Sequence, residues 1–147
     1  MSGQEPEALP TVVSLLICDT VVDDRLSNKK SAIGIFNTIL VPRVPAIINQ
    51  MAILASVTEI NGRAELELRL VRDADDVTLF SGKGQVEAPN PLAVVDLLFA
   101  MQGVHIPQEG QYAFEILSHE ALLGRRRFQV LLRPPGPVPP PGLHPLT

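Results

Sequence analysis

The 147-residue chain has one cysteine, no tryptophan, one tyrosine and three histidines. A single cysteine cannot form an internal disulfide, and no Cys/His cluster has the spacing of a zinc site, which fits a reducing compartment. No apolar run approaches the length of a membrane span, and the first ten residues contain two glutamates and no basic segment typical of a signal peptide. We therefore expect a cytoplasmic protein that does not bind membranes.

Positive charge is also scarce, with 12 Lys and Arg against 16 Asp and Glu, a net charge of −4 and a pI near 5.3. Nucleic-acid binding usually needs a basic surface and aromatic stacking platforms, and both are lacking. The one dense basic feature is Arg125-Arg126-Arg127. On a strand these side chains alternate between faces, so we interpret them as a solvated strand start or a deterrent to edge pairing. We expect no nucleic-acid partner.

Hydrophobic residues make up 46% of the chain, and the mean hydropathy is +0.21, enough apolar material for one folded domain. Short runs rich in Val, Ile, Leu and Phe alternate with Gly, Asn, Asp and Pro, which is typical of strands and turns. The predicted strands are 11–22, 32–41, 50–60, 64–72, 77–87, 93–102, 111–118 and 125–132. They predict an all-β fold, an eight-stranded antiparallel two-layer β-sandwich of immunoglobulin-like or jelly-roll-like type.

Several local patterns refine this prediction. The uniformly apolar run 12–18 predicts a central strand covered on both faces. Asn61-Gly62 is suited to a type I′ hairpin turn, so strands 50–60, 64–72 and 77–87 are expected to form a meander. Gly82-Lys83-Gly84 lacks the remaining residues of a phosphate loop and is interpreted as a bulge or bend.

Two later segments bear on the core. Apolar positions in 92–102 suit a strand, which we favour, but also a helix lying across one sheet. Tyr112, Phe114 and Ile116 alternate onto one face after a turn. A tyrosine in that position resembles the tyrosine corner of immunoglobulin-like domains, whose hydroxyl bonds to neighbouring backbone.

The composition changes after Arg133, where seven of the last fourteen residues are proline. Proline lacks a backbone donor, so this segment cannot continue a sheet and favours an extended or disordered state. We therefore divide the chain into a flexible N-terminus (1–10), a β-sandwich domain (11–133) and a disordered proline-rich tail (134–147).

Catalysis by a nucleophile requires a base within reach, and the candidates are Cys18 with His105, His119 or His144. Nothing pairs them: Cys18 lies in an apolar strand, and His144 lies in the proline-rich tail. Since no catalytic or cofactor-binding residues emerge, we expect a protein that is not an enzyme and has no cofactor.

Acidic residues gather in two places, and their oxygens suit hard cations such as calcium. If the fold brought these loops together, a calcium site would result, although no EF-hand spacing is present and loop aspartates commonly form turns. The candidate metal ligands are Asp19, Asp23, Asp24, Asp73, Asp75 and Asp76.

Four segments together resemble a family of small bacterial domains of unknown function. They are Leu16-Ile17-Cys18-Asp19, Lys30 to Asn37 (Lys-Ser-Ala-Ile-Gly-Ile-Phe-Asn), Pro45 and the Gly-x-Tyr-x-Phe-Glu strand at 110–115. In that family a Cys-Asp pair ends the first strand, and a Gly-Ile-Phe segment begins the second. The resemblance extends over about residues 11–132. It implies an all-β sandwich and brings no activity, cofactor or site residue.

These observations favour a non-catalytic binding or assembly module. Its routes to a partner are the proline-rich tail and the pairing of an edge strand with another protein or a second copy. The alternative is a β-sandwich that binds a small molecule or calcium in loops at one end.

Overall fold

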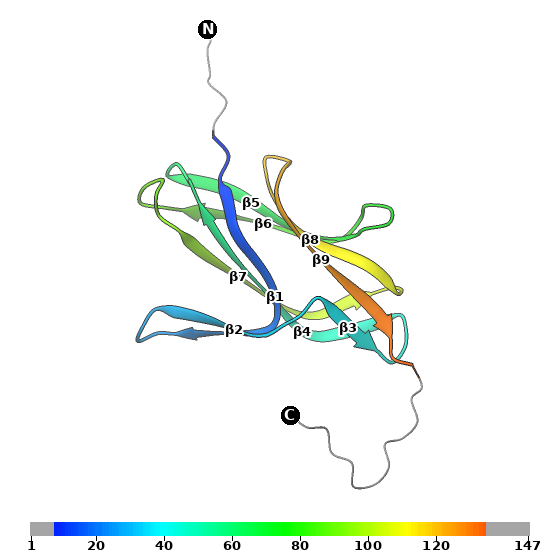
Figure 1. The fold of residues 1–147 in the computed structure, drawn as a ribbon. Coiled ribbons are helices and arrows are strands. Elements are labelled where there is room, and N and C mark those ends of the chain that lie inside the picture. Colours follow the sequence, from blue (N-terminus) through cyan, green and yellow to red (C-terminus); the bar gives the residue numbers. More distant parts are fainter. Residues whose placement is uncertain (1–7, 135–147) are drawn as a thin grey trace.

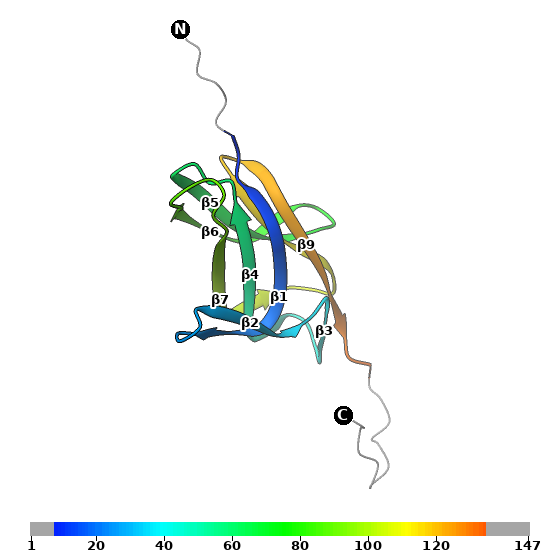
Figure 2. The same cartoon turned by 60° about the vertical axis from the view of Figure 1, so that its left-hand side comes forward.

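The computed structural model describes residues 8–134, which form a two-layer β-sandwich (Figures 1 and 2). This confirms the predicted fold class. The strands are β1 (Thr11–Asp24), β2 (Lys29–Ile35), β3 (Thr38–Val41), β4 (Ala46–Thr58), β5 (Arg63–Arg72), β6 (Val77–Glu87), β7 (Val95–Ile106), β8 (Gly110–Ser118) and β9 (Ala121–Leu132). Residues 1–7 and 135–147, which include nearly all of the predicted tail, lie outside the described residues.

One sheet has four strands in the order β2-β1-β4-β7, and the other has five in the order β3-β9-β8-β5-β6. Every pair is antiparallel except β3 with β9, which run parallel. The prediction of a wholly antiparallel sandwich was therefore wrong for this one pair. The outer strands are β2 and β7 in the first sheet and β3 and β6 in the second, and these edges frame the two open sides of the sandwich.

The predicted strand 32–41 is in fact two strands on different sheets. The chain leaves β2 at Phe36, whose amide bonds to the carbonyl of Ile17, and reaches the other sheet at Asn37, whose carbonyl accepts from Gln129. Asn37 also accepts a 2.9 Å bond from Arg126 through its side chain. Because apolar residues continue through this crossing, the hydrophobic pattern alone does not reveal it.

The hairpin predicted at Asn61-Gly62 was wrong, as was the pairing of strands 50–60 and 64–72. β4 and β5 belong to different sheets, and the loop between them crosses the sandwich. Ile60, fully buried, anchors this crossing in the core. The amide of Gly62 bonds to the carbonyl of Ile60, and Ala88 bonds back to Gly62. The remainder of the meander, β5 paired with β6, is confirmed.

The first strand is less central than its composition predicts. β1 pairs with β4 through Thr11 to Cys18 and with β2 from Cys18 onward, so only Cys18 has a neighbour on both sides. Its first half is exposed at Val13 (59%). Beyond Cys18, β1 bends, and the β1–β2 hairpin projects from the sandwich (Figures 1 and 2). The long apolar run thus lies partly in the sandwich, where it pairs with β4, and its end begins the hairpin with β2.

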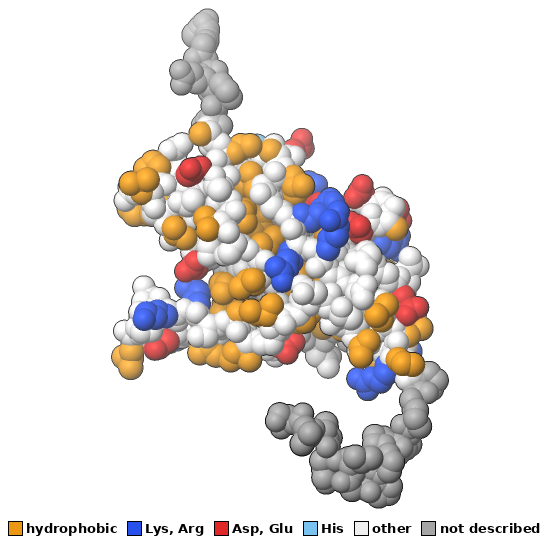
Figure 3. All heavy atoms as spheres, in the orientation of Figure 1, with side chains coloured by type: hydrophobic (Ala, Val, Ile, Leu, Met, Phe, Trp, Pro, Cys, Tyr) orange, Lys and Arg blue, Asp and Glu red, His pale blue; other side chains and the backbone are white. Residues whose placement is uncertain are grey.

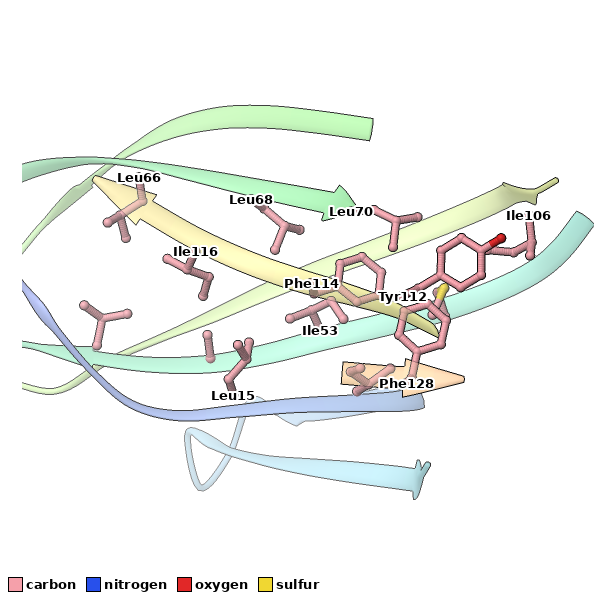
Figure 4. Close-up of a cluster of buried hydrophobic side chains, with 14 of the residues drawn as sticks. Leu15, Ile53, Leu66, Leu68, Leu70, Ile106, Tyr112, Phe114, Ile116 and Phe128 are labelled. Carbon is pink, nitrogen blue, oxygen red and sulfur yellow. The ribbon is translucent and has the colours of Figure 1, made fainter. Parts of the chain in front are cut away.

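The core lies between the sheets and is centred on aromatic residues of β8 and β9. Phe114 and Tyr112 both stack on Phe128, with ring centroids 5.5 and 5.7 Å apart. Figure 4 shows Ile53 of the four-stranded sheet among these rings, opposite Leu70 of the five-stranded sheet. The predicted single face of Tyr112, Phe114 and Ile116 is confirmed, because all three side chains belong to the buried cluster between the sheets.

Tyr112 also has the geometry of a tyrosine corner. Its hydroxyl donates a 2.6 Å bond to the carbonyl of Gln108, four residues upstream. A buried phenol needs such a partner, since an unpaired hydroxyl in the core is costly. This bond fixes the loop between β7 and β8 against the aromatic core.

Candidate protein-binding edge

The outer face of the five-stranded sheet is covered by ion pairs. Glu115, only 6% exposed, bonds to the guanidinium of Arg125, which also lies 3.8 Å from Asp73. The hydrogen bond that Arg125 donates to Glu115 raises the pKa of the Arg125 guanidinium. Arg127 lies 3.4 Å from Asp73. The side chains of Arg125 and Arg127 thus lie on the same side of β9, as predicted. Their positive charges are compensated by Glu115 and Asp73 on the same face.

The opposite pattern holds along β1, where hydrophobic side chains are exposed. Figure 3 shows them beside the Lys and Arg side chains that gather over β9. Hydrophobic side chains also mark the outer face of the four-stranded sheet, where Ile33, Ile35 and Leu98 are between 40% and 52% exposed. A side-chain hydrogen bond on this sheet is the 2.6 Å bond that the Ser56 hydroxyl donates to Asp96. The two layers therefore present chemically different surfaces.

The six aspartates predicted as metal ligands form two groups that do not meet. Asp19, Asp23 and Asp24 lie on the β1–β2 hairpin, and Asp73, Asp75 and Asp76 lie at the β5–β6 turn on the other side of the molecule (Figures 1 and 2). Within residues 8–134, no three His, Cys, Asp or Glu side chains are placed to hold a metal ion. The loop arrangement that the calcium hypothesis requires is absent from the described part of the chain.

Two of these aspartates have clear roles in turns. Asp24 accepts bonds from the Ser27 hydroxyl (2.8 Å) and the Leu26 amide (3.0 Å), which lower its pKa. Asp75 is held by both arms of the Arg72 guanidinium at 3.0 and 2.8 Å, which lowers its pKa as well. These bonds satisfy the carboxylates locally, as expected of turn-forming aspartates.

The residues considered for nucleophilic catalysis are also separated. Cys18 is fully buried, and its thiol donates a weak 3.7 Å bond to the carbonyl of Ala52. Burial raises the pKa of this thiol, so it stays protonated at neutral pH, and a protonated thiol is a poor nucleophile. His105 lies on β7 and His119 in the β8–β9 turn of the other sheet, whereas His144 lies outside the described residues.

Two of the four segments that carry the family resemblance pair with each other, around Asp19 and Gly34. Asp19 lies opposite Gly34 in the β1–β2 register, between the paired Cys18 and Ile35 on one side and Thr20 and Ile33 on the other. Gly34 has φ +71°, and a Cβ there would overlap the Asp19 carboxylate. The shared residues thus build the bend of β1, a structural role.

We expect Gly34→Ala to lower the free energy of unfolding by about 2 kcal/mol, because left-handed backbone strain adds to the clash with Asp19. Chemical denaturation gives this value. In an Asp19→Ala background the loss should fall to about 1 kcal/mol, since the overlap with the carboxylate is gone and mainly backbone strain remains. Gly84→Ala, where nothing lies within 4 Å, is the control. Equal losses at Gly34 and Gly84 would refute the assigned role.

Three of the four edge strands carry features that oppose pairing with another chain. β2 contains Lys29 and Lys30, and β3 is four residues long and is followed by Pro42 and Pro45. β6 carries Lys83 near its middle. Lysine, proline and short length are the usual protections of an exposed sheet edge, because each obstructs strand addition.

β7 is the exception. It is twelve residues long, and its only formally charged residue is Asp96, next to its start. Within residues 8–134, β4 is the only strand hydrogen-bonded to β7, so the backbone groups along its other side have no strand partner. Figure 2 shows β7 at the margin of its sheet beside β4. A long edge with a single charge near its start is a template for a further strand.

An apolar cleft of about 340 Å³ borders this edge, where β7 faces β6 across the open side of the sandwich. Its lining residues are Leu70, Leu79, Phe80, Ala100, Met101, Gln102, Gly103, Val104 and His105. Phe80 is 45% exposed at this opening. The volume lies at the lower end of the range of ligand pockets and accommodates one or two large apolar side chains.

Glycines on β6 keep the cleft side open. Gly82 and Gly84 lie opposite Leu68 and Leu66 in the register, so they occupy the inward-facing positions of β6 and add no side chain there. The irregularity predicted at these glycines lies instead at Leu79, which is the extra residue between the paired Phe80 and Thr78. The bulge at Leu79 thus lies at the cleft itself, whereas the glycines follow it along β6.

The importance of β7 as an edge was missed by sequence reasoning. The strand 93–102 was predicted correctly, and the alternative helix is excluded, because Val95–Ile106 is a strand. Its place in the sheet depends on strand order, which periodicity does not specify. One sequence feature could have indicated it. An edge strand with one face in water usually carries charged residues, whereas the run from Leu97 to Val104 has none.

The comparisons with known proteins identify a family but bring no activity. A model described as a family of unknown function, DUF6941, matches residues 13–131. No curated protein matches the chain. Within residues 8–134, no helix is long and apolar enough to cross a membrane.

Proposed function

The chain belongs to DUF6941, a family of unknown function, and from that premise we propose that it is a non-catalytic binding module that adds an extended protein strand to the β7 edge. The observation that carries this proposal is the unprotected edge of β7 beside an apolar cleft. Main-chain bonds to an edge supply affinity, and pockets for alternate side chains supply specificity.

The alternation of β7 defines the complementary strand. Leu97, Phe99 and Met101 pack against the core, while Leu98 and Ala100 face outward. A strand added to this edge continues the alternation, so every second side chain lies over the cleft. The partner segment should therefore be extended, free of proline, and apolar at every second position, at least opposite Phe99 and Met101.

The absence of charged residues along the middle of β7 also favours an apolar partner strand. Between Leu97 and Val104 neither strand face carries a charged residue, and the cleft is lined mainly by apolar side chains, with Gln102 and His105 as its polar ones. Burying such groups against an apolar strand is favourable at roughly 25 cal/mol per Å², whereas a charged strand would lose hydration without gaining a partner. The preferred ligand is thus a neutral segment.

Hydrogen exchange tests the proposal directly. An 11-residue peptide of alternating Val and Thr, with lysines at its ends for solubility, should slow exchange of the outward-facing β7 amides at least several-fold. The same peptide with a central proline should not protect them, because it lacks a donor and distorts the strand. Met101→Lys should weaken protection by placing a charge at the cleft, with the exposed Gln85→Lys on β6 as the control.

Protection confined to β6, or protection that survives the central proline, would refute strand addition at β7. The expected partners, the proposed lack of enzymatic activity and the cytoplasmic location remain predictions, as does a bacterial origin. A role for the proline-rich segment 134–147 is a separate prediction, which the described residues do not address.

A further inference from the structure

We infer that the strand received by β7 is β7 of a second copy of this chain, paired antiparallel about a two-fold axis at Ala100. This inference rests on the proposed function, because it names the occupant of the same edge. Two four-stranded sheets would then join into one continuous sheet, with β7 of each copy at its centre. Two-fold dimers of this kind need one self-complementary surface and no second site.

The position of the charges favours pairing between copies of β7. Asp96 is the only formally charged residue of the strand and lies at its second position. Antiparallel pairing about Ala100 places Asp96 opposite Val104 of the second copy, so the two carboxylates lie about 27 Å apart along the strands. A parallel arrangement would place them side by side. Antiparallel self-pairing therefore avoids repulsion between the two Asp96 carboxylates.

The axis at Ala100 also maximises overlap. It pairs Val95 with His105 of the second copy, so all but the last residue of β7 takes part. On the outward face two exposed alanines meet at the axis, and their small size allows close approach. On the cleft side Phe99 meets Met101 of the second copy, two large apolar side chains suited to a cross-strand pair.

The other long edge does not offer this complementarity. β6 has Lys83 next to its midpoint, and a two-fold axis there would bring two ammonium groups onto neighbouring positions. By contrast, pairing of β7 also covers exposed apolar surface on both sides of the edge, with Leu98 (40%) on the outward face and Phe80 (45%) at the cleft. Charge and exposure thus select the same edge for a second copy.

Disulfide trapping of the full chain tests the pairing and its register. Ala100→Cys lies on the axis, so mild oxidation should convert most of the protein to a covalent dimer, because opposed residues in antiparallel strands have suitable Cα separations. Gln85→Cys, equally exposed on β6, should stay monomeric. The native Cys18 is fully buried and should not crosslink.

Leu98→Cys and Gln102→Cys provide the test of register. Each is offset from the axis, so either alone should crosslink poorly, whereas a mixture of the two should form the mixed dimer, since Leu98 pairs with Gln102 of the second copy. Crosslinking of Leu98→Cys or Gln102→Cys alone as strong as that of Ala100→Cys would overturn the proposed axis.

Sedimentation of the wild-type chain separates failure of this inference from failure of the proposed function. We expect a concentration-dependent dimer, and Ala100→Lys should raise its dissociation constant at least tenfold, with Gln85→Lys unchanged. A wild-type monomer at all concentrations would overturn the second copy as occupant. If the Val/Thr peptide still protected the β7 amides, the proposed binding edge would be retained and only the second copy as its occupant would be rejected. If the peptide gave no protection, the binding edge and the dimer would both be rejected.

Discussion

Phe114→Ala should lower the free energy of unfolding by about 3–5 kcal/mol, the cost of removing a fully buried aromatic side chain. Phe114 has no exposed surface, and its ring stacks on Phe128 at 5.5 Å. The neighbouring sheet supplies Ile53 to the same cluster (Figure 4). Because three strands meet at this point, the space left by the ring cannot close without moving both layers.

Urea denaturation followed by circular dichroism measures the effect, and Phe80→Ala is the matched control. Phe80 is 45% exposed at the cleft, so the same substitution there should cost about 1 kcal/mol or less. Similar losses for the two variants would show that the aromatic cluster is not the centre of the core. The comparison uses one residue type at two depths, so side-chain volume is held constant.

Arg125→Met should cost about 2–3 kcal/mol, because it leaves the Glu115 carboxylate buried without its cation. Glu115 is 6% exposed, and the Arg125 guanidinium is its hydrogen-bonded partner. Breaking a buried pair by removing one member is far more damaging than removing both. We place the loss below the range for fully buried pairs, since 29% of the Arg125 side chain reaches solvent.

The double substitution Arg125→Met/Glu115→Met provides the decisive comparison, since it removes both charges. It should recover most of the stability lost in the single variant, measured by the same denaturation experiment. Arg126→Met is the control on the adjacent residue, because Arg126 bonds to the neutral amide of Asn37. If Arg126→Met proved as damaging as Arg125→Met, charge compensation at Glu115 would not explain the effect.

The sequence predicted the sandwich because its strands alternate clearly where one face is buried. The run from Ala64 to Leu70 is the best example, with Leu66, Leu68 and Leu70 in the core. It also predicted the tyrosine corner, since the hydroxyl of Tyr112 needs a partner close in sequence, and the carbonyl of Gln108 supplies it. Local patterns therefore yield elements and local contacts.

The order of the strands in the two sheets could not be predicted from these local patterns. Asn61-Gly62 has the composition of a tight hairpin, yet the burial of Ile60 directs the chain across to the other sheet. Likewise, the crossing at Phe36 and Asn37 depends on partners in β1 and β9 that are distant in sequence. The candidate edge at β7 followed from strand order, so it too became visible only with the assembled sheets.

The parallel pairing of β3 with β9 determines when the domain can close during synthesis. Asn37 and its partner Arg126 are 89 residues apart, so the five-stranded sheet lacks its final arrangement until almost the whole domain has been made. The four-stranded sheet needs nothing beyond β7 and is complete earlier. A nascent chain that stops before β9 therefore lacks Phe128 and Val130, and the core residues that pack on them stay uncovered, so it is at this stage that chaperones have a substrate to bind.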